Sequence, residues 1–114
     1  MNSRLPLMPG SAGSALAVER AARQAIERTI RAGVQTYDRL RDLPGLVRMD
    51  PAACATDAGA LQDLIVTKLA RALRAERSKA RSGHWTYDLN RHIALRQAYV
   101  AEIERQESLR GGRR

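Results

Sequence analysis

The stretch DAGALQDLIVTKLARALRAERSKARSG, residues 57–83, decides the fold class. Its larger aliphatic residues recur at spacings of three and four, which places them on one face of an α-helix. Thr56 or Asp57 can cap the start of this helix, and Gly83 is a typical residue just beyond a helix end. The pattern predicts an amphipathic helix over 57–82, with an apolar face made of Leu61, Leu64, Ile65, Leu69, Ala72 and Leu73.

The end of this helix changes character, because residues 74–83 contain no apolar side chain larger than alanine. Such a segment has nothing large to bury. We therefore expect residues 74–84 to be exposed to solvent and to exchange their amide protons faster than the helix around Leu69.

A second helix is predicted over 14–42, N-terminal to residues 57–83. Ser14 is a plausible N-cap, and Pro44 with Gly45 should stop the helix. Gly33 within the stripe favours a bend or a close helix crossing. The stripe consists of Val18, Ala22, Ile26, Ile30, Val34, Tyr37 and Leu40.

A third helix is predicted over 86–109, ending before Gly111. We expect Leu61, Ile65 and Leu69 to share one core with Ile93 and Val100 of this helix. Its inner side is predicted to consist of Leu89, Ile93, Tyr99, Val100 and Ile103.

The predicted fold is all-α, a small three-helix domain over 14–110. It becomes a four-helix domain if Asp50 and Pro51 start a short helical turn at 51–55. Proline and glycine punctuate residues 1–13, which are predicted to be a disordered arm, and residues 111–114 are predicted to be a flexible basic tail.

The composition predicts a thin core. Of 114 residues, 44% are hydrophobic, but the chain has no Phe and one Trp, and 19 residues are alanines. Alanine contributes little apolar area, so an open helical arrangement or self-association is expected.

The chain is strongly basic, with 20 Lys and Arg against 12 Asp and Glu. A cationic surface favours polyanions or acidic proteins, although a solvated helical surface also accounts for it. The acidic end of the third helix, with Glu102, Glu104 and Glu107, is opposite in sign and could support head-to-tail association, although an ordinary solvated helix with local ion pairs is the favoured interpretation. The possible polyanion-binding residues are Lys68, Arg71, Arg74, Arg77, Lys79, Arg81, Arg91 and Arg96.

No residue pattern indicates catalysis, a metal site or a cofactor. Cys54 is the single cysteine, and with His84 and His92 it provides too few ligands for zinc. Asp88 and His92 are four residues apart and could pair, but capping of the helix start is the favoured role for Asp88. Trp85 and Tyr87 are interpreted as a hydrophobic anchor rather than a base-stacking platform.

Pro6 and Pro9 interrupt the apolar run of the N-terminus, so the expected location is the cytoplasm, with no membrane span.

Two stretches, RAGVQTYDRLRDLPGLV at 31–47 and RAERSKARSGHWTYDLNRHIALRQAYVAE at 74–102, resemble a family of short bacterial proteins classified only as a domain of unknown function. The resemblance implies a compact helical domain and supplies no activity, cofactor or partner. The family-type positions, whose role is unknown, are Tyr37, Arg39, Arg41, Asp42, Tyr87, Arg91 and His92.

The function predicted from the sequence is binding rather than catalysis. One hypothesis is a regulatory or scaffolding protein that acts through a protein partner or through self-association. The alternative is a nucleic-acid-associated protein that uses the basic cluster at 68–96.

Overall fold

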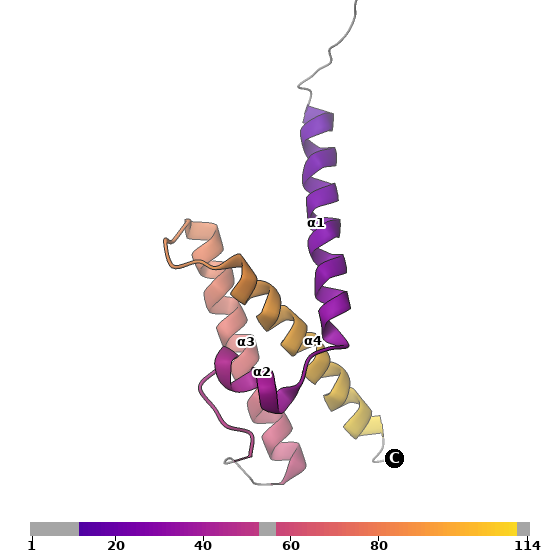
Figure 1. Ribbon diagram of the computed structural model, residues 1–114, viewed down its shortest axis with the longest axis vertical. Coiled ribbons are helices and arrows are strands. Elements are labelled where there is room, and N and C mark those ends of the chain that lie inside the picture. Colours follow the sequence, from indigo (N-terminus) through magenta and orange to yellow (C-terminus); the bar gives the residue numbers. More distant parts are fainter. Residues whose placement is uncertain (1–11, 53–56, 112–114) are drawn as a thin grey trace, which may run out of the picture.

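The computed structural model describes residues 12–52 and 57–111, and the described chain contains four helices and no strand. These are α1 (Ala12–Val34), α2 (Arg39–Leu46), α3 (Ala58–Ser82) and α4 (Leu89–Gly111) (Figure 1). The all-α prediction is confirmed, and the number of helices in the described residues is four, the larger of the two numbers that the sequence allowed. The predicted turn at 51–55 lies partly outside the described residues, as do most of the N-terminal arm, Cys54 and residues 112–114.

Helix α3 matches its prediction at both ends. The carboxylate of Asp57 accepts a hydrogen bond from the Ala60 amide at 2.8 Å, which caps the first turn. Gly83 has a φ of 65°, a conformation that favours glycine because it has no Cβ. The His84 amide then donates to the Lys79 carbonyl at 2.9 Å, closing the last turn as in a Schellman motif.

The predicted helix over 14–42 is two helices in the structure. It begins earlier, at Ala12, so Ser14 is not its N-cap, and it ends at Val34. Asp38 is extended and caps α2, with its carboxylate accepting from the amides of Leu40 and Arg41. This cap starts a new helix that runs in a different direction. The periodic spacing of apolar residues continues across the break and does not reveal it.

Pro44 lies inside α2 instead of stopping the preceding helix, and α2 ends at Leu46. Proline in a helix removes one backbone hydrogen bond, here to the carbonyl four residues earlier. The short helix is nevertheless held in place, because Leu43 is fully buried and Val47 is almost so.

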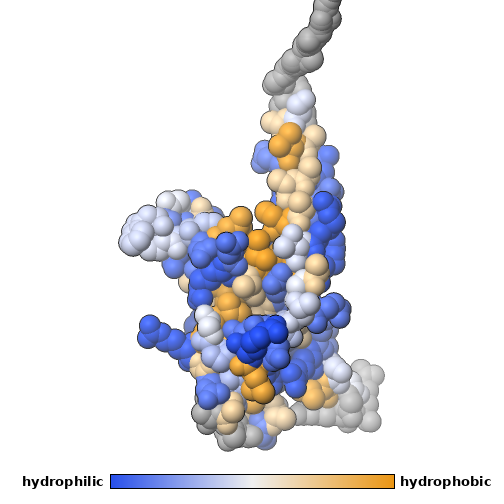
Figure 2. Space-filling view, viewed as in Figure 1, coloured by the Kyte–Doolittle hydropathy of each residue, from blue (hydrophilic) through white to orange (hydrophobic). Residues whose placement is uncertain are grey.

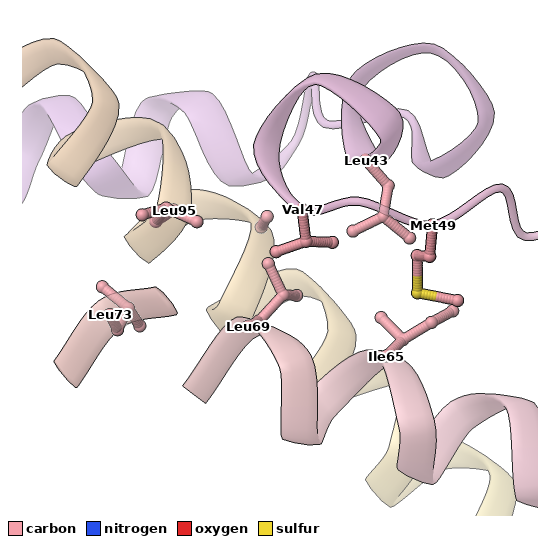
Figure 3. Close-up of a cluster of buried hydrophobic side chains, with 8 residues drawn as sticks. Leu43, Val47, Met49, Ile65, Leu69, Leu73 and Leu95 are labelled. Carbon is pink, nitrogen blue, oxygen red and sulfur yellow. The ribbon is translucent and has the colours of Figure 1, made fainter. Parts of the chain in front are cut away.

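The core lies where α2 and the segment after it cover the α3–α4 hairpin (Figure 3). Ile65 and Leu69 are fully buried there, as predicted, and Leu61 packs at the margin. Leu64 is 39% exposed, so its assignment to the buried face was wrong. The core residues are Leu43, Val47, Met49, Ile65, Leu69, Leu73, Leu95 and Ala98.

The predicted core face of α4 was wrong in part, because α4 packs on two sides, although Tyr99 of that face packs against the core as predicted. It buries Leu95 and Ala98 against α3 and α2, whereas Ile93 and Val100 are half-buried. Ile93 and Val100 lie about 150° around the helix axis from Leu95. They are therefore on the side of Gln97, whose amide donates to the Thr29 carbonyl of α1.

Helix α1 joins the other helices only through its C-terminal part. Ile30 is its one buried residue among those whose side chains are described, and every residue from 14 to 25 is exposed. Gly33 meets the side chain of Gln97 so closely that a Cβ would overlap it, which confirms a close helix crossing at this glycine. Figure 1 shows the remainder of α1 leaving the other helices. Among the described helices, none combines the length and apolarity that crossing a membrane requires.

Candidate interaction surfaces

The structure divides the predicted basic cluster into separate groups. Lys68 and Arg74 are six residues apart on α3, which places them about 120° apart around the helix. Lys68 and Arg71 face the side of α2, together with Arg91 of α4. Arg74, Arg77 and Arg81 are exposed on other parts of the α3 surface.

Three residues of the cluster are used in contacts within the chain. Lys79 and Arg91 approach the Oε2 atom of Glu76 at 3.2 and 3.6 Å. Arg96 pairs with Glu27 of α1 at 3.1 Å. Only part of the cluster is therefore available to an external anion.

Glu76 corrects the prediction that all of residues 74–84 are exposed. Its side chain is 3% exposed, because α4 covers it and Arg91 reaches across to it. The other residues of the helix end and of the turn are exposed, as predicted, except for the half-buried Lys79. The sequence offered one signal for this exception, since Glu76 lies seven residues after Leu69 and three after Leu73 on the buried face.

A groove of about 340 Å³ lies between α2, α3 and α4. Lys68, Arg71 and Arg91 line it, and so does Arg48, which follows α2 and was not part of the predicted cluster. The rest of the lining consists of Gly45, Leu46, Val47 and Ala72. The groove thus collects cations from segments that are far apart in the sequence.

The family-type positions also fall into two groups. Tyr37 and Arg39 contact Glu102, while Arg41 pairs with the adjacent Asp42 at 2.8 Å and donates to the Thr36 carbonyl. At the other end of the fold, the Tyr87 hydroxyl lies 2.9 Å from Nδ1 of His92. Arg91 donates to the carbonyl of Leu46 at 2.9 Å. The two groups fasten α2 and the start of α4, and they do not form one site.

Glu102 is the centre of a buried polar network. It accepts from the Tyr37 hydroxyl at 2.7 Å, from two nitrogens of Arg39 at 2.6 and 3.0 Å, and from the Gln62 amide at 3.0 Å. Burial alone would raise the pKa of Glu102, but these donors lower it below its ordinary value. Burial and the neighbouring carboxylate raise the pKa of Tyr37. Arg39 also bonds to Gln62, so every member is paired and the network connects α2, α3 and α4.

The predicted role of Glu102 in an acidic patch required an exposed carboxylate. Glu102 is therefore not available to support head-to-tail association. It is 0% exposed, whereas Glu104 and Glu107 are exposed. The acidic end of α4 is correspondingly smaller than the sequence indicated.

Asp88 and His92 do not form the side-chain pair that their spacing allows. Asp88 accepts from the amides of Asn90 and Arg91, so it caps the start of α4. His92 contacts Tyr87 instead, and burial together with nearby Arg77 lowers the pKa of its imidazole. Nowhere in residues 12–52 and 57–111 do three His, Cys, Asp or Glu side chains come close enough together to hold a metal ion.

The most exposed large apolar residues include two on α1 and one at the turn before α4. Leu16 and Val18 are 54% and 69% exposed on α1, and hydrophobic residues run along this helix toward the other helices (Figure 2). Trp85 is 88% exposed and stacks only on the adjacent His84, with ring centroids 6.0 Å apart. The prediction that Trp85 anchors the fold is wrong, because it packs into no core.

Comparisons with protein-family models, with curated proteins and with solved structures found no match.

Proposed function

We propose that this protein acts by binding rather than by catalysis, and that its interaction element is α1, through which two copies associate. The observation that carries the proposal is the exposure of every residue from 14 to 25 in a helix with an apolar face. A helical segment of this length is marginally stable alone in water, and its stability in proteins comes mainly from packing of its apolar face.

The unpacked face continues the face that α4 covers. Ala15, Leu16 and Ala22 lie within about 80° of the buried Ile30 around the helix axis, whereas Arg28 lies on the opposite side. The apolar face of α1 is therefore buried near Ile30, and the same face is exposed in the preceding turns of the helix. Small alanines on this face allow another helix to approach closely.

The charges on this face favour a second copy as the occupant. Glu19 and Arg23 lie near its centre, one turn apart, and neither forms an ion pair within the described chain. In an antiparallel pair of α1 helices related by a two-fold axis at position 21, Glu19 of each copy faces Arg23 of the other. The same register places Leu16 of each copy opposite Ile26 of the other, so charge and apolar complementarity coincide.

Sedimentation equilibrium of the full chain tests the proposal. We expect a concentration-dependent dimer for the wild type and a monomer for Glu19→Arg or Arg23→Glu, because each substitution places like charges opposite each other twice. The double variant E19R/R23E should dimerise again. Gln24→Glu changes the charge of the outer face and should leave the dimer intact.

A wild type that stays monomeric at all concentrations contradicts self-association and leaves a different protein as the partner. Dimers that survive both single substitutions, or a double variant that stays monomeric with α1 helical by circular dichroism, exclude α1 pairing in this register.

A further inference from the structure

The groove between α2, α3 and α4 contains cations that no described residue neutralises. The side chains of Lys68 and Arg71 of α3, and that of Arg48 after α2, form no hydrogen bond or ion pair in the part of the chain that the structure describes. No carboxylate is among the lining residues. Like charges gathered in one concavity repel each other, and an anion between them relieves that repulsion.

Arg91 is the fourth cation, and its position is set in advance. Its Nη2 atom donates to the Leu46 carbonyl at 2.9 Å, and its Nε atom lies 3.6 Å from the Glu76 carboxylate. Glu76 is buried, and Lys79 also approaches its carboxylate. Holding one guanidinium in place lowers the conformational entropy that binding an anion costs.

We propose that this groove binds a phosphate group and that its source is the phosphodiester backbone of a nucleic acid. Arg and Lys side chains are the usual partners of phosphate oxygens, and a volume of about 340 Å³ is sufficient for a phosphate with its sugar. Arg74, Arg77 and Arg81 extend the exposed positive surface from the groove around α3. A surface longer than one phosphate matches a polyanion better than a free phosphate ion.

The matched test compares two double variants that each remove two positive charges from α3. K68Q/R71Q changes the groove, whereas R74Q/R81Q changes exposed arginines outside it. Fluorescence anisotropy of the full chain is measured with a labelled single-stranded RNA and a duplex DNA, each about 20 nucleotides or base pairs long, over a range of salt.

K68Q/R71Q should weaken binding by at least about tenfold, and R74Q/R81Q by a clearly smaller factor, because Arg74 and Arg81 meet only the part of the strand that continues beyond the groove. The slope of log affinity against log salt should also become flatter for K68Q/R71Q, by about 1.4 for the single strand and about 1.8 for the duplex. Both variants should unfold at the wild-type denaturant concentration, because both change exposed or half-exposed side chains.

Equal losses in the two variants would show that binding follows net charge, and this would overturn the groove as the site. No binding of either nucleic acid at about 0.15 M salt would overturn the proposed source. In that case, titration with inorganic phosphate, followed by amide NMR shifts of residues 45–48 and 68–72, identifies a site for a free phosphate anion instead.

Discussion

Glu102 is a fully buried carboxylate whose charge depends on one cation, Arg39, 2.6 Å away. Glu102→Gln leaves Arg39 in a largely buried place without its counter-charge. We expect a loss of about 3–5 kcal/mol in the free energy of unfolding, measured with urea. Tyr37→Phe removes one hydrogen bond to the same carboxylate and should cost less, about 1.5–3 kcal/mol. A Glu102→Gln variant as stable as the wild type would show that the network is not required.

The same residue predicts how stability depends on pH. Despite its burial, Glu102 has a pKa below its ordinary value of 4.5, because Arg39, Tyr37 and Gln62 bond to the charged form. The unfolded chain therefore binds the proton more readily than the folded chain does, and the stabilisation is complete only above about pH 5. The free energy of unfolding should decrease as the pH falls through 4.5 and toward the lower pKa of the folded state.

Glu102→Gln provides the control for this acid sensitivity, since the variant has no carboxyl group to protonate at this site. Its unfolding midpoint in urea should decrease less between about pH 6 and pH 3 than that of the wild type. A smaller dependence remains, because Arg41 also lowers the pKa of Asp42. Parallel curves for the two proteins would contradict the assignment to Glu102.

Leu69 tests the aliphatic part of the core. It is 0% exposed, so Leu69→Ala should lower the free energy of unfolding by about 2–5 kcal/mol. Leu64 belongs to the same helix and is 39% exposed, so Leu64→Ala should cost less than about 1 kcal/mol. Denaturant unfolding of both variants measures the difference, and equal losses would mean that the two positions are buried alike.

At the level of helices, the same substitution should have opposite effects at two glycines. Gly83 has a positive φ with no atom close enough to crowd a Cβ, so Gly83→Ala loses about 1 kcal/mol through backbone strain alone. Gly45 lies inside α2 with the same open surroundings and no positive φ, and Gly45→Ala should gain up to about 1 kcal/mol from helix propensity. Thermal unfolding of both variants gives the signs, and a stabilised Gly83→Ala would contradict the left-handed helix end.

The helices differ in how much of them could be predicted, and the difference has a physical cause. Residues 58–82 were predicted almost to their ends because the cap, the apolar spacing and the glycine are all local signals. The break between α1 and α2 depends on Asp38 accepting two amide hydrogen bonds, and the apolar stripe runs across it without interruption. The buried face of α4 was misplaced because α4 contacts α1 on one side and α2 and α3 on the other.

For the whole molecule, net charge indicated a cationic surface. It did not indicate that the basic residues fall into separate groups on that surface. The spacing of three residues along α3 already implied that the basic residues spread around the helix. The sequence could not show that Arg48 joins Lys68 and Arg71, or that Glu27 and Glu76 hold Arg96 and Arg91, because these contacts join distant segments. The link between Tyr37 and Glu102, 65 residues apart, was unpredictable for the same reason.

The open shape leads to a last prediction, for hydrogen exchange along α1. Residues 14–25 are all exposed, whereas residues 27–34 are fastened to α4 by the Arg96–Glu27 pair and by Gln97. At low protein concentration, amides in 14–25 should exchange much faster than those around Ile30, because local fraying needs little free energy there.

If two copies pair through α1, raising the concentration should slow exchange in 14–25 and leave the α3 amides near Leu69 unchanged. Glu19→Arg should remove the concentration dependence but not the difference between the two halves of α1. Protection in 14–25 that equals the protection around Ile30 even in dilute protein would show that another part of the same chain covers the helix, and it would contradict both the open shape and the pairing.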